Sequence, residues 1–449
     1  MSSAVERFEC IVVGAGPAGI AAALTLARAG VKVVVFERGE FPGAKNVMGG
    51  VLYGKTLGKL VPGFQKEAPL ERPIIEQSMW MLSADSAIKA GYRSPRFTPG
   101  YEAEGGVPDD GPANAYSVLR AKFDRWFAQK AVDAGALLVT ETAVNDLLWE
   151  DGKVVGVETG RDNGKVYADT VIVAAGVHAL NSLIPKLADG RLGIKPEHVA
   201  LAVKQIIALP KEKIEDRFNL PAGMGATIEL VGASSSGMTG ISFIYTNQES
   251  LSIGVGAMLS DYVKSGKHPY DVIEDFKAHP AIKPLVAGGE VKEYLGHLIP
   301  EGGYNAVPKL YGDGFMVIGD SAMLVNSIHR EGSNLAMESG RLAAETFIKA
   351  KANKDFSSRS LAAYKDALDN KSFVLKDLRK YRGLQHYLDS HPQLFLTYPE
   401  MASEAAFRLL NVDEATKAEH EKRIMQAFTK RRSLTGLLSD LWAGWRATR

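Results

Sequence analysis

Three glycines near the N-terminus have the spacing of a phosphate-binding turn. Gly14, Gly16 and Gly19 form the motif G-x-G-x-x-G, and the acidic residue Glu37 follows about 20 positions later. In this motif the first glycine permits a tight turn, the second lets a diphosphate approach the backbone, and the third lets helix and strand pack closely. The N–H groups of the helix N-terminus would face the diphosphate, and Glu37 would accept hydrogen bonds from the hydroxyls of an adenosine ribose. The motif therefore predicts dinucleotide binding, with NAD and FAD as alternatives.

Two later strand ends carry residues that could reach the same ligand. Residues 169–176 form an apolar run that ends in small residues, and residues 314–318 form another, which is followed by Gly319 and Asp320. Both runs are typical of buried parallel strands. Because ligands of open α/β sheets bind at the carboxyl ends of such strands, Asp320 is a candidate binding residue.

The segments around the glycine motif have the composition that its geometry needs. Residues 8–13 and 31–36 predict strands, and residues 18–29 predict a helix between them. The run 11–36 is also the most apolar part of the chain, but the cations and glycines inside it argue against a membrane span. Further along, residues 153–168 predict a hairpin with a polar turn.

Three of these features together resemble the FAD-dependent oxidoreductases of the glutathione-reductase-like superfamily. They are the glycine motif with Glu37, the segment 120–124 and the pair formed by Gly319 and Asp320. The similarity is to the branch of p-hydroxybenzoate-hydroxylase-like and geranylgeranyl-reductase-like enzymes, and it implies that the cofactor is FAD. The flavin would then carry the chemistry, so no side chain of this chain is expected to be catalytic.

The resemblance also implies roles for individual residues. Asp320 would hold the ribityl chain, and Arg120 would lie along the diphosphate and ribityl region. The helix after Gly332 would direct its positive end at the pyrimidine edge of the flavin, where it would stabilise an anionic reduced flavin. Ala179 departs from the family pattern, since a serine or similar residue usually stands there, and this weakens one contact. The residues expected to bind the cofactor are Gly14, Gly16, Pro17, Ala18, Gly19, Glu37, Arg38, Lys45, Gly49, Gly50, Arg120, Val144, Gly176, Gly319, Asp320, Gly332, Ser333 and Asn334.

Further motifs narrow the resemblance. Residues 44–50, 279–290, 299–304 and 329–332 are similar to electron-transfer-flavoprotein:quinone oxidoreductases of the FixC (EtfC) type. The similarity extends over nearly the whole chain, from residue 8 to about residue 398. The glycine pair at the end of the first motif has a local reason, because close approach of backbone to a planar ring needs residues without Cβ; an ordinary loop turn is the alternative.

Cys10 is the only cysteine of the chain. A single cysteine excludes an internal disulfide, a redox-active cysteine pair, and an iron–sulfur or zinc site built from several thiolates of this chain. Its apolar neighbours predict a buried, unreactive strand residue. Single-chain members of the resembled family carry a 4Fe–4S cluster in a C-terminal ferredoxin-like region, whereas in the FixC type the cluster belongs to a small ferredoxin-like subunit. The resemblance therefore implies that subunit as a partner, an electron-transfer flavoprotein heterodimer as electron donor, and a quinone as acceptor.

The composition is that of a conventional globular protein. The 449 residues predict two or three units, and 46% hydrophobic with 23% charged residues is enough for an ordinary core. A net charge of +1 gives no general electrostatic reason to bind nucleic acid. The N-terminus lacks a secretion pattern, which favours a cytoplasmic protein, expected at the inner face of the membrane as a peripheral protein if quinone is its acceptor.

We therefore expect an α/β protein with a glutathione-reductase-like FAD-binding Rossmann domain, an inserted β-rich substrate or quinone domain, and a helical C-terminal region. The expected limits are residues 1–183 and 304–356 for the two FAD-binding parts, 184–303 for the inserted domain and 357–449 for the helical region. The insertion is inferred from short β-like runs at residues 199–208, 225–231, 240–245 and 250–255.

One run of the inserted domain bears on the substrate. Residues 240–247 lack the tryptophan and proline of the aromatic motif that geranylgeranyl reductases carry in this region, which argues against polyprenyl reduction. Tyr245 in this run is either a quinone-side or flavin-side residue or a tyrosine on a strand face.

The C-terminal region predicts helices at residues 361–388, 402–410 and 416–429. The chain then continues with a basic triplet and an apolar face, formed by Leu434, Leu437, Leu438, Leu441, Trp442 and Trp445. An apolar face with tryptophan and flanking cations is typical of a helix that lies in a membrane interface. The alternative is a helix packed on this protein or on the ferredoxin-like partner, and the sequence leaves both open.

The expected function is electron transfer from an electron-transfer flavoprotein, through FAD and a partner's iron–sulfur cluster, to quinone. The sequence does not decide whether the complex is NADH-dependent and bifurcating. One alternative is a stand-alone NAD(P)H-dependent flavin reductase or monooxygenase of the geranylgeranyl-reductase type, and another is a docking subunit that only holds FAD. Gly223 and Gly225 lack the third glycine and the acidic residue of a second dinucleotide motif, and no metal-ligand cluster is evident, since His178 and His329 are typical of packed or surface histidines.

Overall fold

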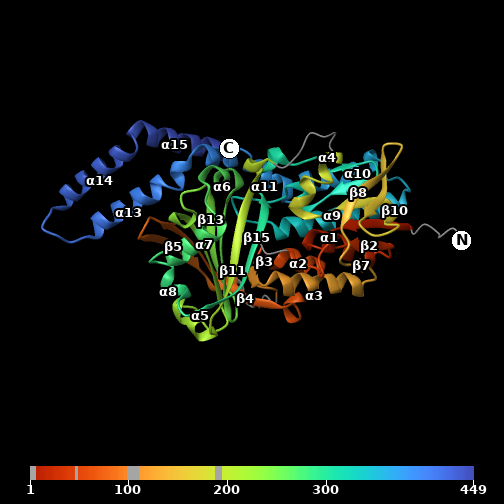
Figure 1. Cartoon of the computed structure of the whole chain (residues 1–449), viewed down its shortest axis with the longest axis horizontal. Helices are drawn as coiled ribbons and strands as arrows, with labels where there is room; N and C mark the ends of the chain where they lie inside the picture. The colour runs from red at the N-terminus through yellow and green to blue at the C-terminus, as the bar shows by residue number, and fades with distance from the viewer. Residues whose placement is uncertain (1–6, 46–48, 99–110, 188–194, 449) are drawn as a thin grey trace, which may run out of the picture. The chain divides into compact units, whose positions relative to one another are not determined.

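The computed structural model describes residues 7–45, 49–98, 111–187 and 195–448, which fall into two compact units (Figure 1). Unit 1 consists of Met1–Glu71, Asp110–Val199 and Ile299–Lys380, and unit 2 of Arg72–Asp109, Ala200–Leu298 and Tyr381–Arg449. The described residues 72–98, expected within the first FAD-binding part, therefore belong to unit 2 by their contacts. The limits of the functional domains stay a prediction.

Unit 1 is built on a mainly parallel sheet with the strand order β16-β17-β10-β1-β2-β7. Its strands are β1 (Arg7–Val13), β2 (Val33–Phe36), β7 (Leu137–Val139), β10 (Lys165–Val173), β16 (Tyr311–Gly312) and β17 (Phe315–Val317). β1 lies between β2 and β10 and is parallel to both, and β10 is parallel to β17. The predicted strand, glycine turn, helix and strand are confirmed, with α1 spanning Pro17–Arg28. Cys10 in β1 is buried as expected, and burial raises the pKa of its thiol.

Helices α1, α3 (Arg120–Asp133) and α9 (Ser333–Ala352) pack together in unit 1. α1 and α9 meet closely, because a Cβ at Gly340 would lie 2.1 Å from the carbonyl oxygen of Ala18. The predicted hairpin is confirmed by the antiparallel pairing of β9 (Lys153–Thr159) with β10, and β8 (Val144–Glu150) extends it. A short antiparallel pair, β3 (Val51–Tyr53) and β6 (Ala115–Val118), precedes α3.

Unit 2 contains a larger, mainly antiparallel sheet with the order β15-β11-β14-β13-β12-β4, to which β5 is added beside β4. The strands are β4 (Leu70–Leu82), β5 (Ala87–Arg93), β11 (Val199–Ala208), β12 (Gly225–Gly232), β13 (Gly240–Thr246), β14 (Ser250–Met258) and β15 (Glu290–Pro300). The four predicted β-like runs are confirmed as β11 to β14. β4 runs parallel to β12, which is why the segment after residue 71 joins this unit.

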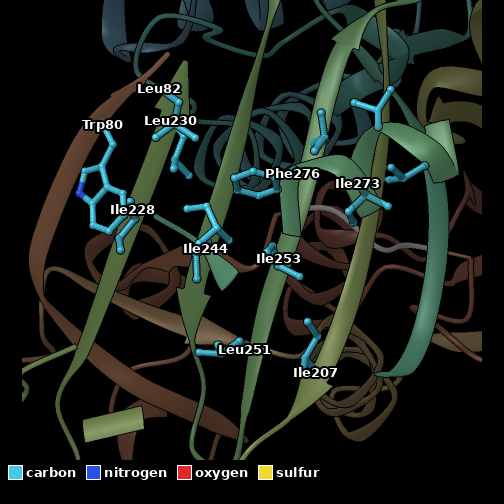
Figure 2. Close-up of a cluster of buried hydrophobic side chains, with 14 of the residues drawn as sticks. Trp80, Leu82, Ile207, Ile228, Leu230, Ile244, Leu251, Ile253, Ile273 and Phe276 are labelled. Atoms are coloured by element: carbon cyan, nitrogen blue, oxygen red, sulfur yellow. The ribbon is translucent and has the colours of Figure 1, made fainter. Parts of the chain in front are cut away.

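One face of this sheet forms a core with α7 (Pro269–Ala278). Figure 2 shows Ile273 and Phe276 of this helix in one buried cluster with apolar side chains of the sheet, among them Leu230, Ile244 and Ile253. The side chains alternate along β14: Leu251, Ile253, Val255 and Ala257 enter the core, whereas Ser252, Gly254 and Gly256 between them do not belong to it.

The C-terminal residues form separate short helices. They are α10 (Ser358–Asp366), α11 (Val374–Lys380), α12 (Leu384–Ser390), α13 (Thr397–Leu410), α14 (Lys417–Arg431) and α15 (Leu434–Ala447). The expected single helix over residues 361–388 is wrong, because a π-helical turn at Ala367–Lys371 and the extended Ser372 interrupt it. Within the part of the chain that the structure describes, no helix has both the length and the apolar character to cross a membrane.

Candidate functional site

The three glycines of the turn between β1 and α1 differ in how closely they are packed. A Cβ at Gly14 would lie 2.4 Å from the carbonyl oxygen of Ala174, and one at Gly19 would lie 1.9 Å from that of Gly14, so packing requires both glycines. A Cβ at Gly16 would meet nothing within 4 Å. Gly16 directly precedes α1, which has Pro17 in its first turn and no side-chain cap at its N-terminus. This is a cradle in which a diphosphate can contact the backbone.

Glu37 is held against this turn by its own carboxylate. The N–H of Ala15 donates to one oxygen at 2.9 Å, and the N–H of Gly39 donates to the other at 2.7 Å. The carbonyl oxygen of Glu37 also accepts a hydrogen bond from Thr142, two residues before Val144. Glu37 is therefore a neighbour of the glycine turn, and the segment just before β8 lies beside Glu37. The roles of Glu37 and Val144 toward the cofactor stay a prediction.

Asp320 lies directly after β17 in the short 3₁₀ helix Gly319–Ala322. Burial raises the pKa of its carboxyl to about 6, and the charge of Arg120 only partly opposes this effect. No hydrogen bond from a described residue stabilises the ionised carboxylate. A partly buried carboxylate without a donor is suited to accept hydrogen bonds from ligand hydroxyls.

Arg120 is the first residue of α3 and is buried. It forms a bidentate pair with Asp124, in which its Nε and Nη2 donate to the two carboxylate oxygens at 2.7 and 2.8 Å. Gly49 has φ +78°, and a Cβ there would lie 2.7 Å from Nη1 of Arg120. The carbonyl oxygen of the buried Gly50 accepts a hydrogen bond from Val118 at 2.9 Å. The glycine pair is thus packed against the arginine predicted to lie along the cofactor.

The Asp320 segment, the glycine turn and α9 meet at Gly319. This residue has φ +59°, and a Cβ there would lie 2.8 Å from Cβ of Ala18. Its N–H donates to Oγ of Ser339 at 3.1 Å, and Oγ of Ser321 donates to the carbonyl oxygen of Gly176 at 2.9 Å. Two motifs that are about 300 residues apart are therefore brought into contact.

The N-terminus of α9 carries a further unsatisfied group. Gly332 precedes the helix, and no side chain caps it. Asn334 is buried, and its Nδ2 donates to Oε2 of Glu331 at 3.2 Å, whereas its Oδ1 has no hydrogen-bond partner. Ser333 donates weakly to the carbonyl oxygen of Val51 at 3.4 Å. Free helix N–H groups beside an unpartnered amide oxygen fit the donors and acceptors of a flavin pyrimidine edge.

The remaining predicted positions are less informative. The side chains of Arg38 and Lys45 are exposed. Partial burial, together with the charge of Arg38, lowers the pKa of His178. Residues 46–48 of the predicted 44–50 motif lie outside the described residues. In unit 2, the ring of Tyr245 stacks on Phe243 with 4.7 Å between ring centroids, and its role toward flavin or quinone stays a prediction.

Two residues that support the site were missed by sequence reasoning. Ser339 accepts the Gly319 N–H and donates to the carbonyl oxygen of Ala336 at 2.8 Å. Tyr364 of α10 is fully buried and donates to the carbonyl oxygen of Val317 at 3.0 Å. Both side chains therefore hydrogen-bond to the backbone just before Asp320, Ser339 at the N–H of Gly319 and Tyr364 at the carbonyl oxygen of Val317. The row of small residues on α9 was the only sequence signal that could have pointed to Ser339.

These groups are suited to an anionic dinucleotide. The glycine turn and the Asp320 segment bring together the uncapped N-termini of α1 and α9, the carboxylate of Asp320 and the buried Arg120. Among the described residues, no group of side chains could hold a metal ion.

The comparisons with known proteins agree with this geometry. Residues 9–178 match the model described as FAD dependent oxidoreductase, and residues 384–449 match the ETF-QO/FixC family C-terminal domain. The chain is 48% identical over 447 residues to Protein FixC of Azorhizobium caulinodans, with 99% of both chains covered. It is 40% identical over 423 residues to Protein FixC of Escherichia coli K12, with 94% of both chains covered.

Two solved structures share the fold. A geranylgeranyl bacteriochlorophyll reductase-like protein from Thermoplasma acidophilum superposes with a TM-score of 0.70 at 19% identity, covering 95% of this chain and 97% of that chain. The flavin-dependent brominase Bmp2 superposes with a TM-score of 0.62 at 19% identity, covering 94% and 100%. At this identity the likeness shows the fold alone. The predicted fold class and the FAD cofactor are confirmed.

Proposed function

Since the chain belongs to the ETF-QO/FixC family and is an FAD-dependent oxidoreductase, we propose that it takes electrons from an electron-transfer flavoprotein and passes them on toward quinone. A separate small subunit with a 4Fe–4S cluster would connect the two steps. The acceptor is a lipid-soluble quinone, so the chain would work at the surface of the membrane.

The binding roles that we propose follow the polar groups of unit 1. The N–H groups at the start of α1 would hold the diphosphate, Glu37 the adenosine ribose, and Asp320 the ribityl hydroxyls. The N-terminus of α9 with Asn334 would face the flavin ring, and its positive end would favour a reduced, anionic flavin. When bound, FAD supplies the capacity to accept and release electrons singly or in pairs.

The need for a partner subunit follows from the cysteine content of this chain. The family match extends over 99% of the chain, yet Cys10 is its only cysteine, and it is buried in β1. Because a 4Fe–4S cluster needs about four thiolate ligands, a cluster on the path to quinone must come from another subunit.

The proposal is tested by mixing the FAD-loaded chain with reduced electron-transfer flavoprotein under anaerobic conditions. We expect bleaching of the flavin absorbance of this chain, and turnover with a water-soluble quinone analogue only after the cysteine-rich subunit is added. The chain without that subunit is the matched control. Rapid oxidation of NADPH or NADH by the isolated chain would instead support the stand-alone reductase. A flavin that no donor reduces would support the docking subunit.

We extend the proposal to an NADH-dependent bifurcating assembly in which this chain carries the electron directed to quinone. The assembled complex would then oxidise NADH only when quinone and a low-potential acceptor are both present. Turnover with quinone alone would contradict this extension and leave the simpler electron-transfer function intact.

A further inference from the structure

Glu331 is an acidic residue directly before the N-terminus of α9. It stands one position before Gly332, the N-cap of the helix, and the first turn of α9 contains no acidic residue. Its side chain is partly exposed, and Oε2 accepts a hydrogen bond from Nδ2 of Asn334 at 3.2 Å. A negative charge therefore lies beside the positive end of the helix and beside an amide whose Oδ1 is unpartnered.

The position of Glu331 is fixed by the backbone of the loop before α9. The N–H of Asn326 donates to the carbonyl oxygen of Glu331 at 2.8 Å, and the N–H of Glu331 donates to that of Asn326 at 3.1 Å. Arg330 between them has φ +54°, a left-handed conformation that closes the turn. Asn326 itself is buried and follows the Asp320 segment closely in the chain. Glu331 is thus held at both of its backbone groups, independently of its side chain.

The carboxylate of Glu331 decides which way the amide of Asn334 points. An ionised carboxylate can only accept hydrogen bonds, whereas an amide has an NH2 donor on one side and an oxygen acceptor on the other. The NH2 group of Asn334 therefore faces Glu331, and Oδ1 is directed away from it. Asn334 is 6% exposed, and leaving a buried acceptor unpartnered costs free energy unless a ligand donates to it.

We infer that Glu331 is a positioning residue for the flavin, which acts through the amide of Asn334 and through its own charge. With the amide oriented by Glu331, Oδ1 can accept a hydrogen bond from N3–H, the donor on the pyrimidine edge of the isoalloxazine ring. The carboxylate also opposes the positive end of α9, so it makes an anionic reduced flavin less stable and lowers the reduction potential. The inference rests on the proposed placement of the flavin at α9, but it does not depend on the electron donor or acceptor.

The effect of the charge is tested by anaerobic reduction of the FAD-loaded chain together with a reference dye, followed by flavin absorbance. In Glu331→Gln the charge is removed, and the equilibrium constant for reduction should rise at least about tenfold, which is about 30 mV for a two-electron couple. Glu345→Gln is the matched control, because it removes the same charge from α9 about 18 Å from the first residue of the helix. Its reduction potential should equal that of the parent chain.

The positioning role is tested by fluorescence titration with FAD. Asn334→Ala and Glu331→Ala should each weaken FAD binding about fivefold, since each removes or misorients one hydrogen bond to the cofactor. The double variant should bind no more weakly than Asn334→Ala alone, because Glu331 acts on the affinity through Asn334. Additive losses in the double variant would overturn the positioning role.

Circular dichroism establishes that the variants are folded, and Glu331→Gln keeps the size of the side chain if Glu331→Ala does not fold. An unchanged reduction potential in Glu331→Gln, or an equal shift in Glu345→Gln, overturns the inference. If Asn334→Ala leaves FAD affinity and the flavin spectrum unchanged, the flavin does not lie at α9, and the proposed placement fails together with the inference. Weaker binding by Asn334→Ala, with no effect of either change at Glu331, would overturn the inference alone.

Discussion

Asp320 is the residue whose environment is hardest to explain without a ligand. Its carboxyl is partly buried near Arg120, yet no described residue donates a hydrogen bond to it. Ionising such a group is unfavourable, and its pKa rises from 3.8 to about 6. Proteins tolerate a cost of this kind mainly at binding sites, where the ligand provides the missing donors.

Asp320→Asn should therefore have opposite effects on stability and on FAD binding. Between pH 4 and 6 the folded state binds a proton more tightly than the unfolded chain, so the stability contribution of Asp320 falls as pH rises through about 6. At pH 7.5 the neutral amide should stabilise the FAD-free protein by up to about 3 kcal/mol, and at pH 4.5 by much less. FAD should bind about tenfold or more weakly, because a charged acceptor is lost.

Thermal unfolding of the FAD-free parent chain and of the FAD-free variant at the two pH values measures the change in stability. Fluorescence titration with FAD measures the change in affinity. An equal change of stability at both pH values would show that ionisation of Asp320 is not the cause.

Ser339 should act on FAD only through the backbone of Gly319. Ser339→Ala leaves the buried Gly319 N–H without its acceptor, which costs about 1–3 kcal/mol. We expect weaker FAD binding and an altered flavin absorbance spectrum, with Ser339→Thr partly restoring both. Ser182→Ala, which removes an exposed hydroxyl near the end of β10, is the control. If Ser339→Ala lowers stability while flavin affinity and spectrum stay unchanged, Ser339 is structural and does not position Asp320.

At the scale of elements, β4 shows how distant segments are joined in unit 2. Arg72 in this strand is 1% exposed and donates to the carbonyl oxygens of Asn247, Met224 and Gln248 at 2.6 to 2.9 Å. It also forms an ion pair with Glu215 at 2.9 Å. The guanidinium therefore ties β4 to the loop before β12 and to the turn between β13 and β14.

Arg72→Met should strongly destabilise unit 2. The apolar side chain leaves several buried carbonyl oxygens without donors, and removal of one partner of a buried ion pair typically costs about 3–5 kcal/mol. Lys213→Met on the exposed face of α5 (Lys211–Arg217) is the control and should change stability by less than about 0.5 kcal/mol. Urea unfolding followed by circular dichroism measures the free energy of unfolding of both variants. A loss below about 1 kcal/mol for Arg72→Met would contradict the role of Arg72 in joining β4 to the two loops.

At the scale of the whole molecule, the proposed cofactor contacts all belong to unit 1, whereas the sheet packed on α7 and the helix α15 belong to unit 2. Each unit has a core of its own. The two units can therefore respond differently to the same ligand.

FAD should protect unit 1 selectively against hydrogen exchange. At about 100 times its dissociation constant, a ligand that binds only the folded state adds about 2.7 kcal/mol to the unfolding free energy. We expect slower exchange in α1, in the segment after β17 and at the start of α9, and little change in β13 and β14. Mass-spectrometric exchange with and without FAD measures this. Equal protection of both sheets would show that the units unfold together, and absence of protection in α1 would contradict the proposed site.

The glycine motif with Glu37 was sufficient to predict a dinucleotide-binding Rossmann unit, and FAD was implied by the family resemblance that this motif, the segment 120–124 and the pair Gly319 and Asp320 carry. These features are local: a turn, a helix start and a short apolar run depend on residues close together in the chain. The break within residues 361–388 could not be predicted, because helical periodicity continues through the π-helical turn at Ala367–Lys371.

Other features depend on segments that are far apart in sequence. Only the tertiary structure placed β4 beside β12, Ser339 against the Gly319 N–H, and Asp320 in a partly buried setting without a described donor. It also decided which side of α15 is exposed, because Asp440 binds Arg432, Gln393 and Tyr398 and turns the leucines and tryptophans outward. Composition and periodicity indicate which residues of a segment favour a core over water. Which of them become buried, and which groups they hydrogen-bond, is set by long-range packing.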